Sequence, residues 1–145
     1  MPITFRIDHE RKLVIARGYG RLTDVELFSY QREAWSGKDV IGYNELVDMT
    51  LVSEIASPSA QRLQALASIA AHMDPETLPS RFAIVAPGDL AYGLARMFQS
   101  YRELENTSTK DVRVFRVLSD ALAFLKISEP VPLPPLPPGT GAKEQ

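Results

Sequence analysis

Residues 81–104 read RFAIVAPGDLAYGLARMFQSYREL, and this stretch decides the fold. It opens with an apolar run at positions 82–86, which has the length of a buried strand. Pro87 and Gly88 then interrupt the chain, and Asp89 is expected to cap a helix by accepting its first backbone N–H groups. Strand, tight turn and amphipathic helix make half of a βαβ unit, and ligands bind beside such turns in open α/β sheets.

The helix that follows Asp89 carries two stripes of side chains at helical spacing. We expect the apolar stripe to face the core, and it consists of Leu90, Leu94, Met97, Phe98, Tyr101 and Leu104. The second stripe is a candidate binding surface, and it consists of Tyr92, Arg96, Gln99 and Glu103. Tyr92 and Arg96 lie one turn apart, so their side chains can together bind a carboxylate, a phosphate or a partner's backbone. The alternative is a stripe that only faces solvent.

The N-terminal part of the chain predicts two strands and a helix. Residues 3–7 and 13–16 read as an antiparallel hairpin, which the Gly-Tyr-Gly at residues 18–20 is expected to end. Thr23 and Glu26 then form a capping box at the start of a helix. The apolar side of this helix consists of Leu27, Phe28, Ala34 and Trp35.

A third strand, a second helix and a final strand and helix complete the pattern. Residues 46–49 are too few for a helix and read as a buried strand. Ser57 is expected to cap the next helix, with Pro58 at its first position, where the missing N–H costs nothing. Near the C-terminus, residues 112–117 predict an edge strand and Ser119 predicts the cap of a short helix.

The element order is therefore β-β-α-β-α-β-α-β-α. Strands that alternate with helices favour an α/β fold with a mainly parallel, mixed sheet, to which the N-terminal hairpin adds antiparallel strands. Residues 1–127 are assigned to this domain. Residues 128–145 form a tail that we expect to be extended or disordered and outside the core, because six of the eleven prolines fall between positions 130 and 138. As an alternative, its P-x-x-P patterns can dock in an aromatic groove.

The composition is ordinary for a soluble protein of one domain. The chain has 145 residues, of which 45% are hydrophobic, and it has no cysteine, which excludes disulfides, a thiolate nucleophile and a cysteine-based metal site. The net charge of −2 argues against nucleic acid as a partner. No apolar run has the length of about 18 residues that a membrane helix needs, and the N-terminus does not read as a signal peptide. We therefore expect a cytoplasmic protein with no integral membrane segment.

Few side chains are arranged for catalysis. Neither His9 nor His72 has a partner at metal-ligand spacing or in a Ser–His–Asp pattern, so we expect no metal, no cofactor and no enzyme activity. Asp48 can orient a ligand, although an acid after a strand more often accepts N–H bonds in the following turn. Ser57 is the best-placed candidate for phosphorylation, because helix N-termini stabilise anions, with plain capping as the alternative.

The order of elements and two runs of residues, 46–59 and 82–97, resemble the STAS superfamily and in particular the small bacterial SpoIIAA-like proteins related to the Sec14 lipid-binding fold. The resemblance covers about residues 3 to 126. It implies a non-enzymatic regulatory or binding module that self-associates or binds a protein partner, or else carries a small hydrophobic ligand such as a lipid or an isoprenoid. Members of the antagonist branch carry a phosphorylated Asp-Ser-Ser-Gly motif, where this chain reads Ala-Ser-Pro-Ser at residues 56–59, so that only Ser57 is kept.

Overall fold

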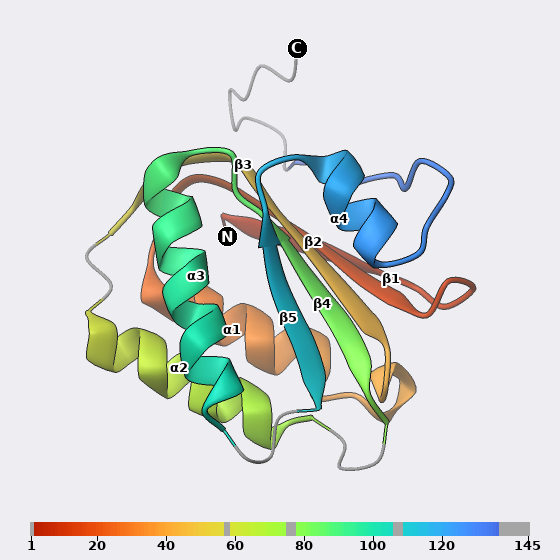
Figure 1. The fold of residues 1–145 in the computed structure, drawn as a ribbon, viewed down its shortest axis with the longest axis horizontal. Helices are drawn as coiled ribbons and strands as arrows, with labels where there is room; N and C mark the ends of the chain where they lie inside the picture. Colours follow the sequence, from red (N-terminus) through yellow and green to blue (C-terminus); the bar gives the residue numbers. More distant parts are fainter. Residues whose placement is uncertain (1, 57–58, 75–77, 106–108, 137–145) are drawn as a thin grey trace.

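A five-stranded mixed sheet forms the centre of the computed structural model, which describes residues 2–56, 59–74, 78–105 and 109–136 (Figure 1). The strands lie in chain order, and they are β1 (Ile3–Asp8), β2 (Leu13–Leu22), β3 (Asn44–Ile55), β4 (Ser80–Val85) and β5 (Lys110–Phe115). β1 pairs with β2 in antiparallel fashion, and every later neighbour pairs in parallel. The predicted α/β fold with an N-terminal hairpin is therefore confirmed.

Helices cover both faces of this sheet. They are α1 (Asp24–Trp35), a short 3-10 helix (Lys38–Val40), α2 (Ala60–His72), α3 (Asp89–Glu103) and α4 (Leu118–Phe124). Successive side chains of a strand point to opposite faces of the sheet, so the core has one part on each face. On β2, for example, Val14 packs in the core beneath α1, α2 and α3, whereas Leu13 and Ile15 pack in the core beneath α4. Figure 1 shows α4 apart from the other three helices.

β2 is longer than the hairpin predicted from the sequence. Residues 18–20 do not end the strand, which continues to Leu22 with irregular register beside β3. Gly18 lies within β2, where an added Cβ would be 2.9 Å from the side chain of Val52, so a larger residue would force a neighbour to move. Gly20 has a φ of 63°, a conformation that glycine adopts without strain. These glycines therefore allow a bulge inside a strand where the sequence suggested a turn.

The predicted caps are correct at α1 and wrong at α4. The backbone N–H of Thr23 donates to Oε1 of Glu26 at 2.7 Å, which confirms the capping box. At α4 the N-cap is Val117, and Ser119 lies inside the helix. The chain leaves β5 at Phe115, so the connection is short and the helix starts before the serine.

The starts of α2 and α3 are also shifted from the predicted positions. The N-cap of α2 is Ser59, whose hydroxyl oxygen accepts the N–H of Arg62 at 3.1 Å, and the predicted cap, Ser57, lies outside the described residues. The N-cap of α3 is Gly88, and Asp89 is the first helical residue. Asp89 therefore carries a negative charge in the first turn, where the helix dipole favours it, without capping the helix.

The apolar stripe predicted for α3 is only partly buried. Leu90, Met97 and Leu104 are 62%, 38% and 75% exposed, whereas Phe98 and Arg102 are buried. The helix is thus rotated relative to the prediction, which followed the largest apolar residues. The packed side instead includes an arginine, which burial tolerates only when a partner neutralises its charge.

The proline-rich tail also differs from the expectation. The sequence predicts a tail that lies outside the core, but Val131 and Pro134 are buried. Val131 packs in the same cluster as Leu13 and Ile15, on the face of the sheet that carries α4. The tail packs here because its contact with these β2 side chains removes apolar surface from water. The domain boundary at residue 127 stays a prediction.

Candidate functional site

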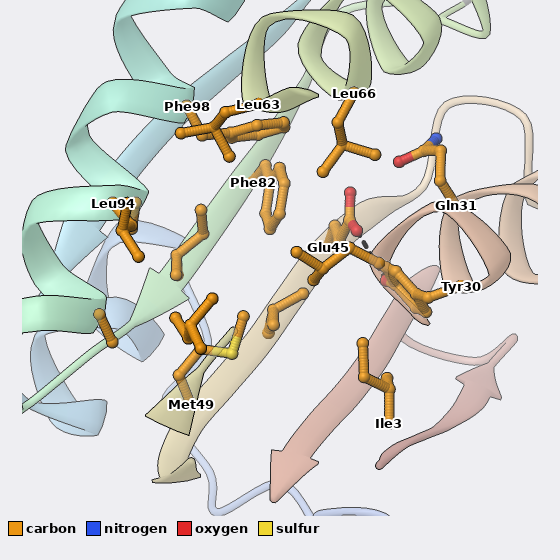
Figure 2. A pocket seen from close by; sticks show the side chains of 16 residues that line it. Ile3, Tyr30, Gln31, Glu45, Met49, Leu63, Leu66, Phe82, Leu94 and Phe98 are labelled. Atoms are coloured by element: carbon orange, nitrogen blue, oxygen red, sulfur yellow. Dashed lines mark hydrogen bonds between the residues drawn. The ribbon is translucent and has the colours of Figure 1, made fainter. Parts of the chain in front are cut away.

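A pocket lies between the sheet and the helices α1, α2 and α3 (Figure 2). Its volume is about 90 Å³, several times the ~10–15 Å³ that a single water molecule requires. Its apolar lining consists of Ile3, Leu27, Val47, Met49, Ile55, Leu63, Leu66, Phe82, Ile84, Ala91, Leu94, Ala95 and Phe98. Three further residues, Tyr30, Gln31 and Glu45, bring polar groups to the lining. A mainly apolar concavity with few polar groups is the usual form of a small-molecule site.

Small residues on α3 leave space for the pocket. Ala91 and Ala95 line it beside Leu94, so the helix approaches the sheet there without filling the gap. Met49, in the middle of β3, and Ile55, its last residue, line the same pocket. The pocket therefore extends toward the carboxyl edge of the parallel strands, which is where ligands bind in open α/β sheets.

The polar part of the pocket is a buried hydrogen-bond network around Glu45. Its carboxylate accepts the hydroxyl of Tyr30 at 2.6 Å and the indole N–H of Trp35 at 3.2 Å. The ammonium group of Lys110 donates to Oε1 of Glu45 at 2.9 Å, and the two side chains are 4% and 1% exposed. The three donors satisfy a charge that would otherwise be costly to bury.

The network shifts the protonation equilibria of its members. Burial lowers the pKa of Lys110, and the carboxylate of Glu45 acts in the opposite direction. Burial, together with the negative charge of Glu45, raises the pKa of Tyr30 well above its ordinary value. Nζ of Lys110 also lies 3.2 Å from the ring centroid of Trp35, a cation–π contact that favours the charged amine. Tyr30 therefore acts as a neutral donor beside the pocket.

A second buried ion pair completes the charge cluster, which we define as Glu45, Lys110, Asp74 and Arg102. The guanidinium nitrogen Nη2 of Arg102 lies 2.8 and 2.9 Å from the two carboxylate oxygens of Asp74. Both side chains are buried, at 1% and 4% exposure. The backbone N–H of Thr109 also donates to Asp74, at 3.3 Å. The cluster links the end of α2, α3 and the start of β5 with a net charge of zero.

Gln31 is the polar residue of the pocket with the weakest internal bonding. Its side chain is buried, and its amide N–H₂ approaches the sulfur of Met73 at 3.6 Å, which is a weak hydrogen bond. Figure 2 shows the amide oxygen of Gln31 on the side of Leu66, at the same end of the pocket as Glu45. A ligand hydroxyl or amide N–H that reached this oxygen would therefore gain a hydrogen-bond acceptor.

The predicted pair of Tyr92 and Arg96 takes a different arrangement. The ring of Tyr92 contacts the guanidinium of Arg116, at 4.0 Å from the ring centroid, and the same guanidinium donates to Asp89 at 2.6 Å. Arg96 is exposed on α3. Tyr92 therefore contacts a residue that follows β5 in the chain. The spacing of residues within α3 could not reveal this contact.

The other two candidate binding residues are also outside the pocket. Asp48 is buried, and its carboxylate accepts both the backbone N–H of Thr50, at 3.1 Å, and the hydroxyl of the same threonine. Gln99 donates to Glu103 at 3.3 Å, and its buried Oε1 has no hydrogen-bond partner within the described ranges. Neither of these residues, nor Tyr92 or Arg96, lines the pocket described above.

The remaining candidates lie at the surface or outside the described residues. Ser57, the phosphorylation candidate, is among the latter. His9 and His72 are exposed, and their Nδ1 atoms lie 2.8 Å from the hydroxyl of Tyr43 and 2.7 Å from the carbonyl oxygen of Ser68. Within the described ranges, no group of three His, Cys, Asp or Glu residues is placed to hold a metal ion. Across those same residues, none of the helices combines the length and the hydropathy of a membrane-spanning segment.

Sequence reasoning missed the pocket because it looked for exposed polar stripes. One signal was available: Gln31 lies at helical spacing from Leu27, Ala34 and Trp35, so a polar residue interrupts the apolar side of α1. Glu45 is harder to anticipate, since it directly precedes the predicted strand and its partner Lys110 is 65 residues away.

Comparison with known proteins adds the fold and no activity. No protein-family model matches the chain, and no curated protein matches it. Among solved structures it is similar to the crystal structure of an uncharacterised protein of the DUF3478 family, with a SpoIIAA-like fold, from Shewanella loihica PV-4. The sequence identity is 18% and the TM-score 0.55, over 85% of this chain and 93% of that chain. The predicted SpoIIAA-like fold is therefore confirmed.

Proposed function

We propose that this SpoIIAA-like domain binds a small, mainly apolar ligand in the pocket between its sheet and helices α1, α2 and α3. The observation that carries the proposal is the pocket itself, about 90 Å³ in volume and lined mostly by aliphatic and aromatic side chains. An engineered cavity of ~150 Å³ accepts a molecule of the size of benzene. The pocket therefore suits a short alkyl or isoprenoid unit, and the rest of a longer ligand would extend outward.

The polar groups at the pocket favour a neutral ligand. A ligand carboxylate beside Glu45 would face a like charge, although Lys110 compensates part of it. A hydroxyl could instead donate to the amide oxygen of Gln31. We therefore propose an alcohol, or a comparable neutral donor with an apolar body, as the class of ligand. Binding is a non-catalytic role, and we assign it to the bacterial cytoplasm.

Filling the pocket should weaken this binding. The variant Ala95→Leu places a larger side chain into the lining, so the affinity for aliphatic alcohols should fall by about tenfold or more, which is ~1.4 kcal/mol. The matched control is Ala123→Leu, an exposed alanine on α4 at the other face of the sheet. Native mass spectrometry of the freshly purified protein and thermal shifts with a panel of alcohols, carboxylates and alkanes measure the effect.

The same panel, extended by the methyl ethers of the alcohols, tests the ligand class. Gln31→Leu removes the acceptor, so the preference for an alcohol over its methyl ether should fall by about 2–10-fold, as expected for one hydrogen bond of ~0.5–1.5 kcal/mol. The exposed Gln64→Leu on α2 is the control. If the wild-type protein carries no added mass and no compound of the panel shifts its thermal unfolding, the ligand-binding function is wrong.

A protein-interaction role is the second candidate, and the outer side of α3 favours it. Leu90 and Met97 are exposed there together with Arg96, and exposed apolar side chains beside a cation are typical of contact surfaces. Leu90→Ser with Met97→Ser should then remove a co-purifying partner, or halve the mass measured by sedimentation if the chain self-associates. The control is Val25→Ser on α1, another exposed apolar residue. An identical set of partners and an identical mass in all three proteins would contradict this role.

A further inference from the structure

The proline-rich segment after α4 is buried with a period of three residues. Val131 and Pro134 are buried, Pro132 and Pro135 are exposed, and the remaining residues of the two turns, Leu133 and Leu136, are intermediate. A polyproline II helix has three residues per turn, so residues i and i+3 lie on the same side. The burial pattern of this segment therefore fits a polyproline II helix that packs one of its sides on the domain.

Two arginines of the sheet bind the backbone of this segment. Nε of Arg6 on β1 donates to the carbonyl oxygen of Pro132 at 2.9 Å. Nη1 of Arg17 on β2 donates to the carbonyl oxygen of Pro134 at 3.4 Å. Polyproline II carbonyls have no hydrogen bonds within their own helix, which leaves them available to external donors. Nη2 of Arg6 is buried and has no hydrogen-bond partner among the residues that the structure describes, so the site holds a further donor for a carbonyl.

The floor of the site is apolar. Leu13 and Ile15 of β2 are 1% and 0% exposed and pack in one cluster with Val131. α4 contacts β4 and β5, at the other side of the same sheet face, so the proline-rich segment provides the cover over β1 and β2. At its start, Glu129 forms an ion pair with Arg11 at 3.4 Å. Backbone carbonyls bound by fixed cations above an apolar floor form a built site for an extended peptide.

We propose that this groove, defined by Arg6, Leu13, Ile15 and Arg17, is a recognition site for proline-rich peptides in the polyproline II conformation, and that residues 129–136 occupy it in cis. The ligand in trans is a proline-rich segment of another polypeptide with an apolar residue and a proline three positions apart. The groove lies on the opposite face of the sheet from the ligand pocket, so the two sites do not overlap.

Covalent attachment makes the tail a strong competitor for its own groove. A short linker gives a tethered segment an effective concentration of the order of mM. A peptide in trans therefore binds the intact chain poorly, and it binds once the tail is released. Side chains that point into the groove should control the release, whereas those that point outward should not.

The test compares two double variants of the full chain. Val131→Ser with Pro134→Ser removes the two buried anchors, and Pro132→Ser with Pro135→Ser removes two exposed prolines and serves as the control. The probe is a fluorescein-labelled peptide with the sequence of residues 127–136, titrated by fluorescence anisotropy. We expect the anchor variant to bind the peptide at least about tenfold more tightly than the wild type or the control. Adding Arg17→Ala to the anchor variant should reverse this gain.

Each alternative result bears on the proposal. A folded anchor variant that does not bind the peptide, or that binds a scrambled peptide equally well, would overturn it. If the anchor variant does not fold alone, the peptide added in trans should restore its native circular dichroism spectrum, and failure to do so would also overturn the proposal. Equal peptide binding by the anchor variant and the control would likewise overturn the proposal, because the groove would then not discriminate between the two sides of the helix.

Discussion

Glu45→Ala is expected to lower the free energy of unfolding by about 3–5 kcal/mol, because it leaves the ammonium of Lys110 buried without its counter-charge. The same change removes the acceptor for Tyr30 and Trp35. Glu45→Gln keeps an acceptor but removes the charge, so it should destabilise less. Urea denaturation followed by tryptophan fluorescence measures both, since Trp35 is the single tryptophan and lies in the network.

The control for this prediction is an ion pair at the surface. Glu54 and Arg21 lie 3.3 Å apart and are 60% and 64% exposed, so Glu54→Ala should cost at most about 1 kcal/mol. The double variant Glu45→Leu with Lys110→Met removes both charges and should be more stable than Glu45→Ala. If Glu45→Ala and Glu54→Ala lower the free energy of unfolding by the same amount, the prediction that burial makes the Glu45–Lys110 pair important for stability is wrong.

Asp74→Ala is expected to have a comparable effect, a loss of about 3–5 kcal/mol, for the second pair of the charge cluster. In the part of the chain that the structure describes, two buried nitrogens of the Arg102 guanidinium have no hydrogen-bond partner, and the variant removes the carboxylate bound to the third. Because Asp74 joins the end of α2 to α3, the loss should also increase amide hydrogen exchange in both helices. Hydrogen exchange and urea denaturation test the two parts.

Asp24→Ala is the matched control. Asp24 also pairs with an arginine on another helix, Arg62, at 2.6 Å, but the two side chains are 31% and 52% exposed. Solvent screens such a pair, so its loss should destabilise the protein much less than the loss of the Asp74–Arg102 pair. A loss as small for Asp74→Ala, or an exchange pattern unchanged in α2 and α3, would contradict the assigned role of the buried pair.

Local patterns in the sequence predicted the elements well. The apolar run at 82–86 lies in and directly after β4, and Thr23 with Glu26 marks the start of α1 because its capping interaction involves only neighbouring residues. The order of strands and helices then restricted the topology to a mainly parallel sheet. Helix starts at Ser59 and Gly88 were missed by one or two positions, since several residues with capping ability compete at each site.

The candidate site could not be predicted in the same way, because distant residues form it. Arg102 belongs to the buried side of α3 only because Asp74 neutralises it, and Glu45 depends on Lys110 in the same manner. Hydropathy alone instead placed Leu90 and other exposed residues on that side. The pocket is the space that small side chains leave unfilled after packing. Its volume depends on the three-dimensional arrangement, so the spacing of residues in the sequence does not predict it.

The sheet order, in which every strand pairs with the one before it in the chain, has a consequence for synthesis. A chain that leaves the ribosome from its N-terminus can add each strand to an edge already formed, and such sequential pairing keeps loop-closure entropy low. The contact of Arg6 with Pro132 spans 126 positions and is made last. Until residues 129–136 emerge, the first strands of the nascent protein present Leu13 and Ile15 uncovered, and it is then that chaperones have apolar surface to bind.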